Sequence, residues 1–113
     1  MKILLVNPLT SNQPGFAKYS VFPYGILFLA AVLEKNKYHV EIYDNNVDDR
    51  KPEDFVSFNP DLIGFSVLTG RSIEDAINQS IRFKEILPKA QIVWGGIHPS
   101  LLPEQTIIEP YID

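Results

Sequence analysis

The chain has 113 residues, 45% of them hydrophobic, which is enough for a single domain with one core. Fourteen acidic residues against ten basic ones give a net charge of −4, which disfavours binding to nucleic acid. Because the chain contains no cysteine, disulfides, thiolate nucleophiles and cysteine-ligated zinc or iron–sulfur centres are excluded, and redox or radical chemistry has to come from outside these residues.

The chain begins with a predicted strand followed by a long loop. Residues 2–7 form a continuous apolar run, typical of a strand buried on both faces, and Pro8 ends the run. Residues 9–23 then form a loop that is more apolar than a solvated loop requires. Its aromatic residues are Phe16, Tyr19 and Phe22. Long loops in compact domains are often functional, and these aromatic residues favour function here.

A helix is predicted from Tyr24 onwards, where apolar residues recur at helical spacing. Apolar residues cover all faces of this helix, so it needs a second packing partner besides the sheet, either the preceding loop or a further domain. Residues 39–44 alternate as a half-exposed second strand, which places Asp44 at the carboxyl end of that strand.

The next elements are a short helix, a strand and a longer helix. Residues 51–58 predict the short helix, and residues 62–68 predict a third strand that is buried on both faces. Ser72 and Asp75 predict a variant capping box that opens the longer helix, which ends before Pro88. The residues expected to face inward from it are Ile73, Ala76, Ile77 and Ile81.

The last part of the chain predicts one more complete strand. Residues 91–94 form this fourth strand, which runs into Gly95 and Gly96, and residues 103–109 predict a helical turn. Residues 111–113 resemble the beginning of a fifth strand. We therefore expect the chain to be a piece of a longer polypeptide.

Strands that alternate with helices predict a parallel sheet with right-handed crossovers. We expect one α/β domain over residues 1–113, with an open doubly wound sheet, the flavodoxin-like order 2-1-3-4-5 and a truncated or marginal fifth strand. Ligands of such sheets bind outside the carboxyl ends of strands one and three, where the strand order reverses. Asn7, Ser66 and Gly95 are predicted to meet at that edge.

The sequence favours a cytoplasmic domain without contact to a membrane. The chain enters an apolar run within two residues, without a charged leader or a cleavage site. No uncharged stretch is longer than residues 19–33, which contain Pro23 and Gly25 and fall short of the roughly 18 to 20 apolar residues that a membrane span requires.

Three short motifs at the predicted strand ends resemble those of cobalamin-binding domains. That pattern is Asp-x-His-x-x-Gly after strand two, Ser-x-Leu after strand three and Gly-Gly after strand four. Ser66 to Leu68 and Gly95-Gly96 fit the second and third motifs, and Asp44 holds the aspartate position. Asn46 stands where the pattern has its histidine, the residue that coordinates cobalt from below.

Longer phrases resemble, more specifically, the amino-terminal cobalamin-binding domain of radical S-adenosylmethionine enzymes. They are FPYGIL at residues 22–27, DLIGFS at residues 61–66 and WGGIHPS at residues 94–100. The resemblance implies a non-catalytic cobalamin-binding module whose complete enzyme performs methyl transfer or a ring-forming or oxidative radical reaction. It further implies that a carboxyl-terminal radical S-adenosylmethionine domain in the same polypeptide binds S-adenosylmethionine and a 4Fe–4S iron–sulfur cluster, which this chain does not bind.

The resemblance also implies a set of cofactor-binding residues at the carboxyl edge of the sheet. Gly95 and Gly96 lack Cβ atoms and so permit a close approach of the nucleotide tail of cobalamin. Ser66 offers a hydroxyl to the base of the tail, and Val67 and Leu68 offer apolar surface to the corrin. The full set is Asn7, Asp44, Asn45, Ser66, Val67, Leu68, Thr69, Gly95, Gly96 and His98. We expect no metal site, because neither His39 nor His98 has a second ligand at a suitable spacing.

Other functions of this fold remain as alternatives. The missing histidine is compatible with a structural or docking domain of the same fold that has lost the cofactor. A phosphorylatable receiver is disfavoured, because it needs acidic residues where Asn7 and Ser66 to Leu68 stand. Residues 8–12 match the hydroxyl-rich phosphate loop of a flavodoxin only faintly.

Overall fold

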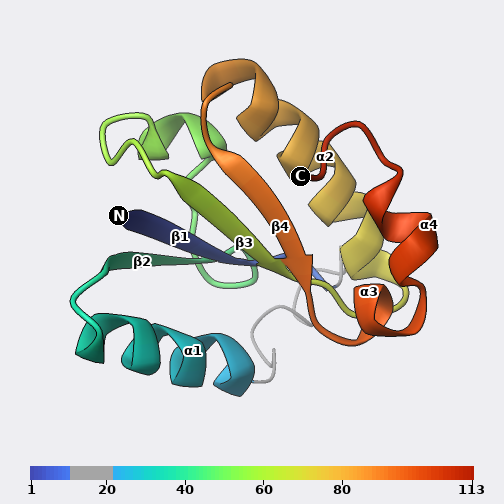
Figure 1. The fold of residues 1–113 in the computed structure, drawn as a ribbon, viewed down its shortest axis with the longest axis horizontal. Helices are drawn as coiled ribbons and strands as arrows, with labels where there is room; N and C mark the ends of the chain where they lie inside the picture. Colours follow the sequence, from blue (N-terminus) through green and yellow to red (C-terminus); the bar gives the residue numbers. More distant parts are fainter. Residues whose placement is uncertain (11–21) are drawn as a thin grey trace.

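Four parallel strands form one sheet in the order β2-β1-β3-β4 (Figure 1). The strands are β1 (Lys2–Asn7), β2 (His39–Asp44), β3 (Leu62–Ser66) and β4 (Gln91–Gly95). This computed structural model describes residues 1–10 and 22–113. The register pairs Asn7 with Asp44 and Ser66 with Gly95, so the carboxyl ends of the strands meet at one edge. The predicted α/β doubly wound sheet of flavodoxin-like order is confirmed.

Helices cover the two faces of the sheet unequally. Helix α1 (Tyr24–Lys35) lies on one face and α2 (Arg71–Ile86) on the other, while α3 (Ile97–Leu101) and α4 (Pro103–Ile107) follow β4 (Figure 1). A short 3-10 helix, η2 (Pro52–Phe55), precedes β3. In the part of the chain that the structure describes, no helix is long and apolar enough to cross a membrane.

The two sides of the core differ in size because the helices cover the two faces of the sheet unequally. On the α2 side, alternating side chains of the strands pack with Phe55 and Phe83 into the larger cluster, in which Leu4, Ile63 and Ile92 are fully buried. On the α1 side, the buried cluster consists of Ile3, Leu5, Ile26 and Ala30. Because α1 packs mainly against β1 and β2, part of the sheet face formed by β3 and β4 is left open, and Val93 is 41% exposed.

The start of α2 differs from the predicted capping box. Gly70 occupies the N-cap, and the hydroxyl of Ser72 is bound to the backbone of Leu68, donating to its carbonyl at 2.5 Å and accepting from its N–H at 3.0 Å. Ser72 therefore lies inside the first turn of the helix and ties it to the loop after β3. The orientation expected of Ile81 is also wrong, since Ile81 is 42% exposed and Phe83 is the large side chain that α2 buries.

Several predicted boundaries differ from the structure. The short helix expected over residues 51–58 is only η2, the third strand ends at Ser66, and residues 97–101 form a helix that was not predicted. Residues 111–113 form no strand, but the N–H of Asp113 donates to the carbonyl of Ile92 at 2.9 Å along the free edge of β4. Most of the predicted loop, with Phe16 and Tyr19, lies outside the described residues.

Candidate functional site

A groove of about 430 Å³ lies between α1 and the open part of the sheet. Its floor contains Gly64 and Ser66 of β3 and Gly95 of β4, and Ile26 and Leu29 contribute to the wall formed by α1. Alternate residues of a strand share a face, so residues 64 and 66 point to the α1 side. Because the residues at these positions are small, their side chains do not fill the groove. Among the described residues that line the groove, Ser66 is the one with a polar side chain.

The turn after β4 closes one end of the groove and is held by the backbone of Val67. The N–H of Val67 donates to the carbonyl of Gly95 at 2.8 Å, and the carbonyl of Val67 accepts from the N–H of His98 at 3.1 Å. Gly96 has φ +99° and ψ −165°, a conformation that glycine alone adopts readily. A Cβ atom at Gly96 would lie 3.0 Å from the carbonyl oxygen of Val67, so the turn requires glycine there.

Gly95 is different, because the fold itself does not require a glycine at this position. Its φ is not positive, and an added Cβ atom would meet only the carbonyl oxygen of Phe65, at an ordinary 3.9 Å. Gly95 nevertheless lines the groove. The missing side chain leaves room beside β4 that the protein does not fill.

A network of polar side chains lies beside the groove, at the ends of β1 and β2. The Oδ1 atom of Asp44 accepts from Asn7 Nδ2 at 3.0 Å and from Asn46, through its N–H at 3.1 Å and its Nδ2 at 2.9 Å. Asn46 is buried, and its Nδ2 also donates to the carbonyl of Pro8. Its Oδ1 accepts from both the N–H and the hydroxyl of Thr10. The side chain of Asn46 is therefore fully hydrogen-bonded within the protein.

A second part of this network centres on Asp75 of α2. Its Oδ2 accepts from the N–H of Leu9 at 2.6 Å, from Asn45 Nδ2 at 3.0 Å and from Gln79 Nε2 at 2.8 Å. The hydroxyl of Tyr43 lies 2.8 Å from Asn45 Oδ1. Burial and the nearby carboxylates, first that of Asp75, raise the pKa of Tyr43 to about 12. These bonds hold the first residues after β1 and β2 against the start of α2.

The structure divides the predicted site residues other than Val67 into three groups. Ser66, Gly95 and Gly96 line the groove. The second group, Asn7, Asp44 and Asn45, belongs to the polar network beside it. Leu68 and Thr69 are exposed after β3, and His98 is half-buried at the start of α3.

The expectation that the side chain of Val67 offers apolar surface to the corrin is wrong. Its side chain is fully buried in the core on the α2 side, because alternation along the chain turns it away from the face that carries Ser66. It therefore offers no apolar surface at the edge of the sheet.

Sequence reasoning missed the groove residues contributed by α1 and by the middle of β3. They include Gly25, Ile26, Leu29 and Gly64. A glycine inside a buried strand, such as Gly64, is a signal of a close approach by another group. The residues were missed because the groove depends on how far α1 extends over the sheet, which single residues do not reveal.

Comparisons with known proteins agree with this geometry. Residues 16–113 match the model of a family described as the B12 binding domain. The curated protein cytidylyl-2-hydroxyethylphosphonate methyltransferase from Streptomyces wedmorensis is 26% identical over 134 aligned residues, covering 99% of this chain. The chain spans about a quarter of the length of that relative, 25%. A comparison with solved structures finds no match.

Proposed function

The chain belongs to the family of B12-binding domains, and we propose that it binds cobalamin with the nucleotide tail in the groove between α1 and the sheet. The observation that carries this proposal is the apolar groove with Gly64, Ser66 and Gly95 on its floor. Cofactor sites are typically concave, mostly apolar and provided with a few placed polar groups. The hydroxyl of Ser66 can donate and accept a hydrogen bond, so it suits the base of the tail.

The polar network supports binding of cobalamin through its nucleotide tail, because the side chain at position 46 is already used in hydrogen bonds within the protein. Bound cobalamin supplies cobalt-centred chemistry, and in domains with the histidine motif that residue is the lower ligand. Here Asn46 uses both N–H groups and both lone pairs of its side chain in hydrogen bonds to Pro8, Thr10 and Asp44. Its role in the proposed complex is to hold the edge of the sheet in shape.

For the complete protein, we propose a radical S-adenosylmethionine enzyme in which this domain presents cobalamin to a carboxyl-terminal catalytic domain. The phrases at residues 22–27, 61–66 and 94–100 support this assignment, and the similar protein from Streptomyces wedmorensis is named a methyltransferase. Methyl transfer is therefore the first reaction to test. Because these residues contain no cysteine, the proposed iron–sulfur cluster would be held by another part of the polypeptide. The full reading frame is expected to encode a Cys-x-x-x-Cys-x-x-Cys run, and its absence would contradict the assignment.

The test of cobalamin binding uses the 113-residue chain and hydroxocobalamin. We expect equilibrium dialysis to show stoichiometric retention of a corrin with a shifted absorption spectrum. Ser66→Tyr should abolish retention, because the tyrosine ring fills the groove. Ser57→Tyr is the matched control, since Ser57 is exposed and does not line the groove. Lack of retention by the unmodified chain, or equal retention by Ser66→Tyr, contradicts the proposal.

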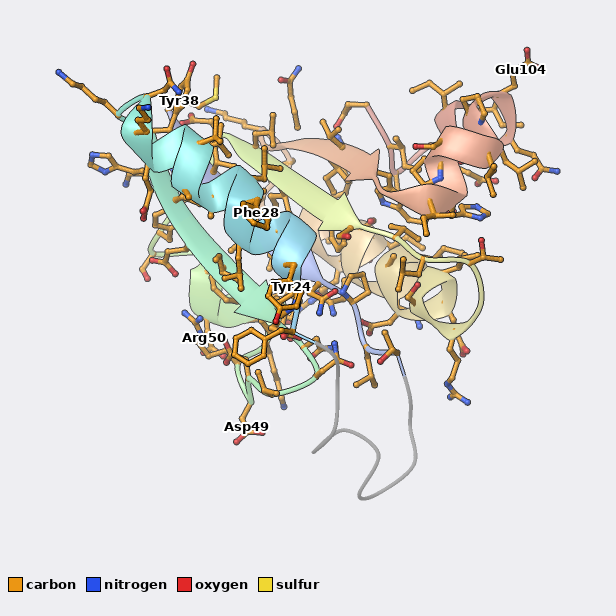
Figure 2. The ribbon with its side chains drawn as sticks, turned by 90° about the horizontal axis from the view of Figure 1, so that it is seen from below. Tyr24, Phe28, Tyr38, Asp49, Arg50 and Glu104 are labelled. Atoms are coloured by element: carbon orange, nitrogen blue, oxygen red, sulfur yellow. The ribbon has the colours of Figure 1, made fainter. Side chains whose placement is uncertain are left out.

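A cofactor-free docking domain is the second candidate, and the outer face of α1 favours it. Tyr24, Phe28 and Val32 are 63%, 72% and 57% exposed, and Figure 2 shows Tyr24 and Phe28 on the side of α1 away from the sheet. Exposed aromatic residues of this kind are typical of interfaces. Stoichiometric uptake of hydroxocobalamin by the unmodified chain would exclude this candidate.

A further inference from the structure

The five glycines that the structure describes differ in what the fold requires of them. Gly70 and Gly96 have φ values of +107° and +99°, which other residues rarely adopt. A Cβ atom at Gly64 would lie 3.2 Å from Cδ2 of Leu5, so the core restricts this position. Gly25 and Gly95 have neither a positive φ nor a close neighbour. Both of these unexplained glycines line the groove.

Gly25 is the more informative of the two, because a glycine there works against the fold. It is the second residue of α1, and among the described residues no atom outside the helix's own backbone lies within 4 Å of the position that its Cβ would occupy. Glycine in a helix costs up to about 1 kcal/mol relative to alanine. Alanine would therefore fit and stabilise the helix. Packing among the described residues therefore does not account for a glycine at this position.

We propose that Gly25 is a specificity-determining residue that keeps the groove wide enough for the nucleotide tail of a corrinoid. It lies on the helix side of the groove, while Gly95 lies on the sheet side, so the tail passes between two backbones that carry no side chain. The inference rests on the proposed function and extends it. If Gly25 leaves room for the tail, a larger side chain at this position should weaken binding of corrinoids that carry a nucleotide tail but not of those that lack one.

The experiment compares Gly25→Phe with the unmodified chain. The ligands are hydroxocobalamin and diaquacobinamide, a corrinoid without the nucleotide and its base. We expect Gly25→Phe to weaken retention of hydroxocobalamin by about tenfold or more and to leave the weaker retention of diaquacobinamide unchanged. Ala31→Phe adds the same ring to an exposed position of the same helix outside the groove, so it should bind both ligands like the unmodified chain.

A second variant separates the width of the groove from the stability of the helix. Gly25→Ala should raise the melting temperature while retaining more hydroxocobalamin than Gly25→Phe, and far-ultraviolet circular dichroism should show the same helix content in all variants. Equal retention of hydroxocobalamin by Gly25→Phe and the unmodified chain would overturn the inference and leave the proposed function intact. An equal loss of both ligands would also overturn it, because the effect would then not act on the tail. Failure of the unmodified chain to bind either ligand would instead contradict the proposed function.

Discussion

Asn46 donates a 2.9 Å hydrogen bond from Nδ2 to Oδ1 of Asp44, and its backbone N–H binds the same oxygen at 3.1 Å. The residue at the histidine position of the cobalamin motif thus fastens the loop after β2 to the end of that strand. Because Asn7 donates to the same oxygen, the loop is also joined to β1. The hydrogen bonds of Asn46 hold the edge of the sheet in shape. A substitution that removes these bonds should therefore destabilise the fold even if the side chain keeps its size.

The substitution Asn46→Asp should destabilise the fold without changing the volume of the side chain. It removes the donors to Pro8 and Asp44 and places a second carboxylate against that of Asp44, so we expect a loss of about 1–3 kcal/mol near neutral pH. Repulsion acts only between two ionised carboxylates, so the loss of stability should shrink as the pH falls and a proton binds.

Urea denaturation at several pH values measures this effect. Asn78→Asp is the control, because Asn78 is an exposed residue of α2 and its change should be small at every pH. A loss of stability in Asn46→Asp that does not depend on pH would argue against repulsion between the two carboxylates.

Gly95, the last residue of β4, and Gly96, the next residue, should respond differently to substitution by alanine. Gly96→Ala forces a Cβ atom to within 3.0 Å of the Val67 carbonyl in a conformation with positive φ, so it should cost about 1–3 kcal/mol or more. Gly95→Ala places its methyl group at ordinary contact distance and should preserve the melting temperature, while its retention of hydroxocobalamin falls because the methyl group enters the groove.

Thermal unfolding measures the stability of both variants, and equilibrium dialysis measures their retention of hydroxocobalamin. The reverse assignment, a stable Gly96→Ala and an unstable Gly95→Ala, would show that the turn is held differently from the structure described here.

Tyr43 should make the fold sensitive to alkali. Its pKa is raised to about 12 in the folded protein from the 10.0 of an unperturbed tyrosine, so the folded state favours the protonated hydroxyl. This contribution is fully present below pH 10 and is lost as the pH rises through 12, a total of about 2–3 kcal/mol.

Comparison with Tyr43→Phe isolates the effect. The variant loses the hydrogen bonds of the hydroxyl and is less stable near neutral pH, but its free energy of unfolding should fall less steeply between about pH 10 and pH 12. Parallel pH curves for the two proteins would rule out Tyr43 as the source of the alkaline loss.

The sheet could be predicted from the sequence because its signals are local. The continuous apolar run at residues 2–7 and the alternation at residues 39–44 identify strands, and the turn at Gly95 and Gly96 marks the edge where the groove ends. Right-handed crossovers and a sheet of at most five strands then favour the flavodoxin-like order.

The rest of the site depends on distant packing. Ser72 matched the spacing of a cap, but the loop after β3 folds back onto its hydroxyl, a contact that the spacing does not contain. Val67 is adjacent to Ser66 in the motif, yet the alternation of the strand buries it on the opposite face. Gly25 joins the groove only because α1 crosses the sheet beside β3, so no local pattern identifies it.

The two sides of the groove are held by forces of different stiffness. The main chains of β3 and β4 are linked by ladder hydrogen bonds that continue past the strands through Val67, whereas α1 is anchored by the buried side chains of Ile26 and Ala30. Apolar contacts have no preferred direction, so the helix can slide by fractions of an ångström at little cost while the ladder cannot. In the proposed complex, corrinoids with bases of different size would therefore be accommodated by small displacements of α1 against a rigid floor.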